Sequence, residues 1–202
     1  MFDDPIIYWI IGAAVILPYC AMALIRRRRR SQELRAPEPK KANNYAALRM
    51  QALNWKCADD HSASPDARAN PCAVVMDWAI GSGVATVVAV SDGTASIYLS
   101  SGGGSIGGSY ARPRIREAAI HAVSTAGNFL EGMLPTDDFP LPDAGGVIFY
   151  VVTDRGVYMA KASEELLSTN RHPLAALGND MQTIIADYRM LETATRINNA
   201  VG

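Results

Sequence analysis

A run of glycine and serine residues at positions 101–109, interrupted only by Ile106, is the stretch of this sequence best suited to binding an anion. It contains a Gly-x-Gly-x-x-Gly pattern, and backbone N–H groups in such a loop before a helix can point at a phosphate or carboxylate. Three arginines follow at alternate positions and would add positive charge. The pattern predicts a ligand site for an anionic small molecule, made by Gly102, Gly103, Gly104, Ser105, Gly107, Arg112, Arg114 and Arg116.

A structural role for the same glycines is the alternative. A β-hairpin is predicted before the run, whereas the dinucleotide fingerprint requires a parallel β–α–β unit. No Gly-Lys-Ser/Thr follows, so the run is not a P-loop. The glycines would then allow an irregular strand end and close packing of the loop at 139–142. Both interpretations stay open at this point.

Other residues that could do chemistry are scattered. The three histidines, His61, His121 and His172, lie far apart in the sequence. The serines among the glycines at 102–109 lack the strand–elbow–helix setting in which Gly-x-Ser-x-Gly forms a hydrolase nucleophile elbow, and no Cys-x-x-Cys occurs. We therefore predict no catalytic residue, no metal site and no cofactor.

The segment Ile6–Ile25 has no charged side chain and is followed at once by Arg26, Arg27, Arg28, Arg29 and Arg30. Twenty helical residues span about 30 Å, the thickness of the hydrocarbon core of a bilayer. The sequence predicts a single transmembrane helix. Arginines stay on the cytoplasmic side, so we expect the N-terminus outside and the rest of the chain inside the bacterial inner membrane. The arginines would act as an orientation signal and could contact anionic headgroups of the bilayer.

The net charge and the cysteines indicate which partners the protein can bind and whether its thiols are reduced. The 19 basic and 20 acidic residues become 14 and 18 once the five arginines, Asp3 and Asp4 are set aside. A net charge of about −4 argues against nucleic acid as a partner. The spacing of Cys57 and Cys72 permits a disulfide, but a reducing cytoplasm favours free thiols.

Hydrophobic periodicity and turn residues divide the remaining chain. Residues 31–41 read as a linker and 42–202 as one domain. Asp92-Gly93 between two β-rich runs predicts a tight hairpin, and Pro113 suits the first turn of a helix. The predicted elements are a helix at 42–57, strands at 72–80, 84–90, 94–100, 147–152 and 157–162, a helix at 113–133, a packed loop at 134–146, and a closing helical region broken near Gly178 whose end at 198–202 frays.

A hairpin followed by a helix therefore occurs twice. The expected fold class is α+β: an N-terminal transmembrane helix plus a domain with a roughly five-stranded antiparallel sheet packed by helices. The order of elements is similar to that of the profilin-like and roadblock/longin-like scaffolds, in topology alone.

Several local sequences resemble a family of uncharacterised bacterial proteins across residues 72–190. The resemblance is carried by Ser96–Gly108 (SIYLSSGGGSIGG), Arg116, Phe139-Pro-Leu-Pro142, Phe149-Tyr150 and Arg171-His-Pro-Leu174. It implies a bacterial source and adds no catalytic residues.

The function expected from the sequence is that of a membrane-anchored cytoplasmic interaction or scaffolding module. Its partner would be another protein or a second copy, bound through a sheet edge or a helix face. The alternative is a sensor or enzyme that binds an anionic small molecule at the Gly102–Gly108 loop.

Overall fold

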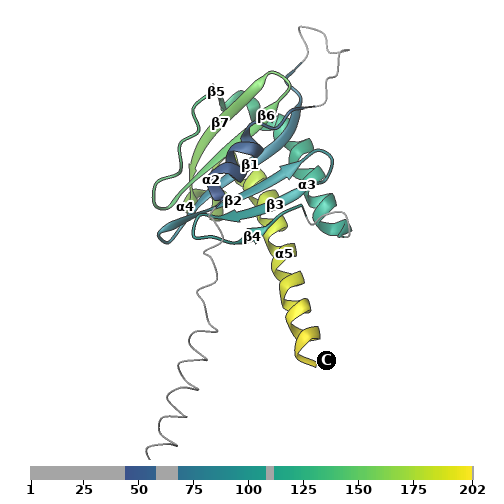
Figure 1. Ribbon diagram of the computed structural model, residues 1–202. Coiled ribbons are helices and arrows are strands. Elements are labelled where there is room, and N and C mark those ends of the chain that lie inside the picture. Colours follow the sequence, from purple (N-terminus) through teal and green to yellow (C-terminus); the bar gives the residue numbers. More distant parts are fainter. Residues whose placement is uncertain (1–43, 58–67, 108–111, 202) are drawn as a thin grey trace, which may run out of the picture. The chain divides into compact units, whose positions relative to one another are not determined.

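The structure is a computed structural model that describes residues 44–57, 68–107 and 112–201. Figure 1 shows a single sheet with helices on both of its faces. All strand pairs are antiparallel, which confirms the predicted α+β class and both hairpins. The strands are β1 (Pro71–Ile80), β2 (Gly83–Val90), β3 (Ala95–Leu99), β4 (Gly104–Ser105), β5 (Leu134–Thr136), β6 (Gly146–Thr153) and β7 (Gly156–Ser163).

The predicted count of five strands is wrong, because the sheet has seven, in the order β4-β3-β2-β1-β6-β7-β5. The two extra strands are the edges, β4 with two residues and β5 with three. Both lie in segments that lack the alternation of apolar residues on which strand prediction relies. One is rich in glycine and the other contains Pro135, which is tolerated only where a strand has a free edge.

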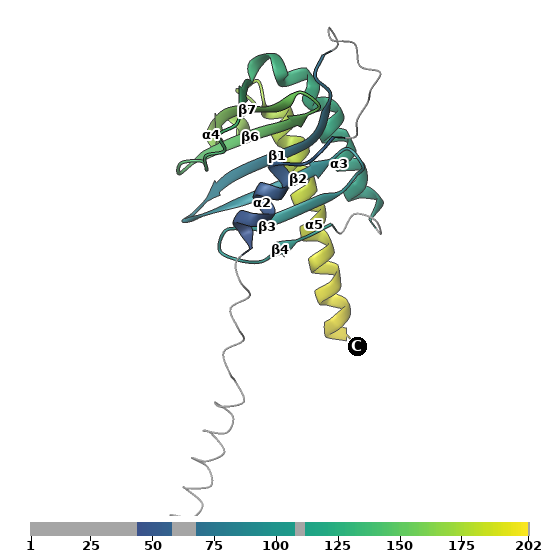
Figure 2. The ribbon, with the colours of Figure 1, turned by 45° about the horizontal axis from the view of Figure 1, so that its top comes forward.

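Helices cover both faces of the sheet. The helix α2 (Tyr45–Leu53) packs on one face, against a core that includes Val75, Val88 and Tyr150. The helices α3 (Pro113–Ala126) and α5 (Ala175–Val201) pack side by side on the other face, as Figure 2 shows. A 3-10 helix η1 (Gly127–Gly132) continues α3, and the short α4 (Glu164–Ser168) precedes α5. Burial on both faces explains why the central strands read as almost continuous apolar runs.

The last helix differs from its prediction. We expected a break near Gly178, but α5 runs without interruption from Ala175 to Val201. Fraying of the end at 198–202 stays a prediction. Leu177, Met181 and Ile184 on this helix are completely buried, and Gly178 lies where a Cβ would be in ordinary contact with Phe149 and Leu167. Tertiary packing therefore outweighs the low helix propensity of the glycine.

The predicted membrane segment lies outside the described residues, as do Arg26–Arg30 and the linker. Among the helices of the described ranges, none is long and apolar enough to cross a bilayer. The expected fold class is thus corrected to a seven-stranded antiparallel sheet packed by helices on both faces.

Candidate functional site

The glycine run forms a tight hairpin between β3 and β4. Gly102 donates its N–H to the carbonyl of Leu99 at 2.9 Å, and Gly102, Gly103 and Gly104 have φ of 99°, 89° and 135°. A Cβ on Gly104 would collide with the carbonyl oxygen of Ile97. The backbone itself therefore requires these glycines. The expected packing against the loop at 139–142 is not seen at Gly102, Gly103 or Gly107, where a Cβ would meet no atom within 4 Å.

Arg116 lies at the other end of β3. Its Nη1 donates to the carbonyl of Asp92 in the β2–β3 turn, and its side chain covers Gly93 so closely that a Cβ there would collide with it. The turn at Gly102 follows the far end of the same strand, about 16 Å away for five residues. The structure does not bring Arg116 and the glycine turn together.

The remaining predicted site residues also lie in two separate places, beside β3 and against α5. Ser105 pairs with Ile97 in the sheet, and Gly107 donates its N–H to Ser96 Oγ at 3.1 Å. Arg112 places its guanidinium over the ring of Tyr188, at 5.8 Å. Arg114 pairs with Asp187 at 3.2 Å. Arg112 and Arg114 therefore contact α5.

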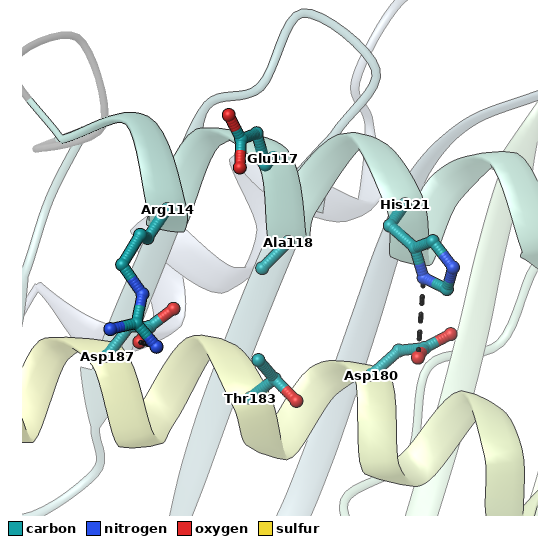
Figure 3. A pocket seen from close by; sticks show the side chains of 7 residues that line it. All are labelled: Arg114, Glu117, Ala118, His121, Asp180, Thr183 and Asp187. Atoms are coloured by element: carbon teal, nitrogen blue, oxygen red, sulfur yellow. Dashed lines mark ion pairs between the residues drawn. The ribbon is translucent and has the colours of Figure 1, made fainter.

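A surface groove of about 370 Å³ lies between α3 and α5, and Figure 3 shows side chains of both helices around it. The two helices run antiparallel in a simple register, with Arg114 paired to Asp187 and His121 to Asp180 at 3.4 Å. Halfway between these ion pairs, the small side chains of Ala118 and Thr183 leave space. The groove is lined by Arg114, Glu117, Ala118, His121, Asp180, Thr183 and Asp187.

Carboxylates predominate in this groove. Asp187 is almost buried and Asp180 also accepts a hydrogen bond from Thr125 Oγ1 at 3.0 Å. Glu117 is exposed and makes no hydrogen bond or ion pair with another described residue. The carboxylates of Glu117, Asp180 and Asp187 lie beside one guanidinium and one imidazole, so acidic side chains outnumber basic ones in the groove.

The groove is not arranged for nucleophilic catalysis. A Ser-His-Asp type mechanism needs a hydroxyl bonded to the imidazole, which removes its proton. Here Thr125 Oγ1 bonds to the carboxylate of Asp180 and to the carbonyls of His121 and Ala122, while the hydroxyl of Thr183 bonds to the carbonyl of Asn179. Within the part of the chain that the structure describes, no three His, Cys, Asp or Glu residues gather as a metal site.

Sequence reasoning did not identify Asp180 and Asp187 as partners of α3. A signal was present, because Arg114 and His121 are seven residues apart, as are the two aspartates. Seven residues are close to two helical turns, so each pair lies on one face of its helix. Matching such pairs between two helices predicts their antiparallel register.

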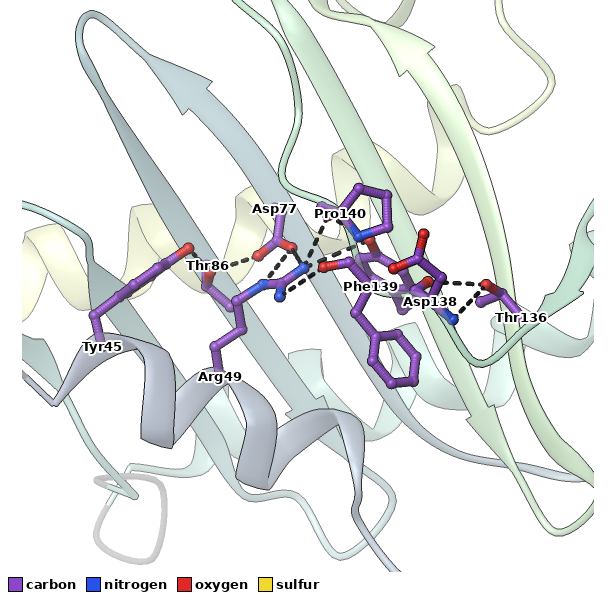
Figure 4. Close-up of polar contacts among 9 residues, drawn as sticks. Tyr45, Arg49, Asp77, Thr86, Thr136, Asp138, Phe139 and Pro140 are labelled. Atoms are coloured by element: carbon purple, nitrogen blue, oxygen red, sulfur yellow. Dashed lines mark hydrogen bonds and ion pairs between the residues drawn. The ribbon is translucent and has the colours of Figure 1, made fainter.

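A second polar cluster is buried on the opposite face of the sheet, between α2 and the strands (Figure 4). Arg49 on α2 donates from Nε to Asp77 Oδ2 at 2.7 Å, and its Nη2 lies 2.6 Å from the same oxygen. It also donates to the carbonyls of Phe139 and Pro140, at 3.1 and 3.0 Å. Tyr150 Oη donates to the carbonyl of Pro140 at 2.6 Å.

The other carboxylate oxygen of Asp77 is satisfied by a relay of hydroxyls. Thr86 Oγ1 donates to Asp77 Oδ1, so the bond of 2.9 Å between Thr86 and Tyr45 has the tyrosine as donor. Asp77 is completely buried and Arg49 is 5% exposed. The cluster joins α2, strands β1 and β2, and the loop after β5. We interpret it as the lock that holds α2 on the sheet.

Burial also affects the tyrosines of this cluster. It raises the pKa of Tyr150 to about 12, although the charge of Arg49 opposes the shift. Burial raises the pKa of Tyr45 as well, against the hydrogen bond to Thr86. Both phenols therefore stay protonated and act as donors in this network well above neutral pH.

Cys57 and Cys72 form a disulfide, with their Cα atoms 5.4 Å apart, so the expectation of free thiols is wrong for this structure. Cys57 follows α2 and Cys72 is the second residue of β1.

Comparison with known proteins adds no family to this description. No protein-family model matches the chain, and neither a curated protein nor a solved structure is similar to it.

Proposed function

We propose that this protein is a membrane-tethered interaction domain whose α3–α5 groove binds a basic helical segment of a partner protein. The observation that carries the proposal is the groove itself. Two ion pairs bound it, small side chains form its middle, and Glu117 stands free among the described residues to receive a lysine or arginine.

The groove suits a macromolecule better than a small molecule. Sites for small molecules enclose most of the ligand surface. Here Arg114, Glu117 and Thr183 are exposed, and the side chains of Arg114 and His121 are 75% and 64% exposed. A helix lying along the groove would cover all of these residues at once.

A sheet edge is less suitable for a partner. The edge strands β4 and β5 offer two and three residues, and short edges give an incoming strand little backbone to pair with. The helix face is therefore the surface that we assign to binding. The anionic-ligand alternative has less support, because Arg112, Arg114 and Arg116 already contact Tyr188, Asp187 and the Asp92 carbonyl.

The membrane tether is supported by the sequence of residues 6–30. An uncharged stretch of twenty residues before five arginines is typical of an inner-membrane anchor with its N-terminus outside. We propose that the domain faces the cytoplasm. The lock at Arg49 would then keep the first helix after the linker attached to the domain.

Affinity capture with the full chain in mild detergent tests the function. The wild type is compared with Glu117→Lys and with the control Glu131→Lys, whose side chain is 91% exposed outside the groove. We expect Glu117→Lys to reduce recovery of the partner about tenfold and the control to leave it unchanged, because a lost charge-assisted contact is replaced by repulsion. Equal recovery by all three proteins would contradict the proposal.

A further inference from the structure

The disulfide between Cys57 and Cys72 connects the segment after α2 to strand β1. Cys57 lies just after α2, the first helix after the proposed membrane linker, and Cys72 lies in β1 at the centre of the sheet. Their Cα separation of 5.4 Å is ordinary for a disulfide. The bond therefore fixes the chain four residues after the end of α2 to the central strand.

Its chemical environment differs from that of disulfides in secreted proteins. The proposed orientation places the domain in the cytoplasm, where thioredoxin- and glutathione-type thiols reduce disulfides. Disulfides in that compartment are usually transient. The inference below rests on this orientation, which is part of the proposed function.

We propose that Cys57 and Cys72 are a reversible thiol–disulfide site that sets how firmly α2 is held on the sheet. The oxidised form holds α2 by the disulfide, by the Arg49–Asp77 lock and by its apolar contacts. The reduced form keeps the lock and the apolar contacts but not the disulfide.

Reduction proceeds by thiol–disulfide exchange with a dithiol. Cys57 is partly exposed and Cys72 is 7% exposed, so a dithiol's thiolate reaches Cys57 Sγ. The new bond forms there and the Cys72 thiolate leaves and takes up a proton. The second thiol of the reductant then attacks the reductant sulfur that is bonded to Cys57. This step closes a disulfide within the reductant and releases Cys57 as a thiol. The dithiol loses two electrons and two protons, and the two cysteines gain them.

The domain can stay folded in both states. Leu53 is 1% exposed and Ala52 is 4% exposed, so α2 keeps its apolar contacts without the disulfide. With only nine residues, however, α2 is too short to be a stable helix when detached. Loss of the disulfide therefore increases local opening of α2 and leaves the sheet in place.

Alkylation in living cells tests whether the site cycles. Full-length protein carrying Cys20→Ser is trapped with a maleimide of high mass before, during and after exposure to diamide. We expect two reactive thiols during growth, a disulfide under diamide, and thiols again on recovery. A disulfide under all conditions, or thiols under all conditions, would overturn the inference.

Hydrogen exchange tests the effect on α2. In the purified full chain, reduction should raise amide exchange within 49–53 about tenfold and leave β6 unchanged, because α2 then opens more often. The double variant Cys57→Ser, Cys72→Ser should show the fast exchange with or without reductant. An amide exchange rate in 49–53 that is the same in the oxidised protein, the reduced protein and the double variant would overturn the inference.

A topology control separates this inference from the proposed function. In the double variant that also carries Cys20→Ser, Ser91→Cys places the only thiol of the protein on the exposed β2–β3 turn. Labelling of that thiol by an impermeant maleimide in intact cells contradicts the cytoplasmic orientation. Protection of that thiol supports the cytoplasmic orientation. If the Cys57–Cys72 disulfide also never changes in the alkylation experiment, only the redox site is contradicted.

Discussion

Arg49 and Asp77 form a buried ion pair that joins α2 to the centre of the sheet, with Nε and Nη2 at 2.7 and 2.6 Å from one carboxylate oxygen. The other carboxylate oxygen of Asp77 accepts a hydrogen bond from Thr86. The guanidinium of Arg49 also donates to the carbonyls of Phe139 and Pro140. A buried charge is tolerated only with such compensation. The pair therefore specifies where α2 docks.

Removal of one partner of this pair should be strongly destabilising. We expect Arg49→Met to lower the free energy of unfolding by about 3–5 kcal/mol, since Asp77 is then left charged and buried. The double variant Arg49→Met, Asp77→Leu should recover much of the loss. Urea denaturation of the full chain in mild detergent measures both. A double variant less stable than either single variant contradicts the compensation described above.

High pH should loosen the same region. The pKa of Tyr150 is about 12 in the folded protein, above the ordinary value of 10.0, so the unfolded chain loses this proton first. The stabilisation is complete below pH 10 and is lost as the pH rises toward 12, by about 1.4 kcal/mol per pH unit.

Tyr150→Phe is the matched variant for this effect. Thermal midpoints measured from pH 9 to pH 12 should fall less steeply for the variant than for the wild type. Tyr45, whose pKa burial also raises, accounts for part of the slope that remains. Identical slopes in the two proteins would show that Tyr150 does not titrate in this window.

The glycine hairpin offers a comparison between neighbours. Gly104→Ala places a Cβ against the carbonyl of Ile97, whereas Gly103→Ala meets no atom within 4 Å and bears only the strain of a positive φ. We expect about 1 kcal/mol of destabilisation for Gly103→Ala and about 2 kcal/mol more for Gly104→Ala. Urea midpoints compare the two. Equal losses would mean that close approach to β3 is not what requires Gly104.

Local signals in the sequence were sufficient to predict the central strands and helices, but not the edge strands of the sheet. Asp92-Gly93 and Pro113 predicted a hairpin and a helix start that the structure confirms, because turn geometry and capping are local. Strands β4 and β5 depend on pairing with β3 and β7, and their own residues do not predict it.

The candidate site was predictable only in part. Arg114 was singled out for its charge, but its partner Asp187 lies in another helix, 73 positions later. Arg49 and Asp77 were assigned to a helix and a strand without a role, although a lone aspartate within an apolar strand is a signal of a buried partner. Contacts of this kind come from tertiary packing.

The ion pairs at the ends of the groove should contribute little to stability. The Arg114 side chain is 75% exposed, so Arg114→Ala should cost less than about 1 kcal/mol. Urea denaturation checks this expectation. A loss above about 2 kcal/mol would show that Arg114 has a structural role, and binding defects of groove variants would then need a different interpretation.

Photo-crosslinking from inside the groove tests the central claim most directly. A photoreactive amino acid replaces Thr183 on the exposed face of α5, or Lys161 on β7 as the control on the opposite face of the sheet. We predict that the Thr183 position alone yields an adduct with another protein, joined through a lysine- or arginine-rich helix. Equal adducts from both positions, or an adduct only with a second copy of this chain, would contradict the account.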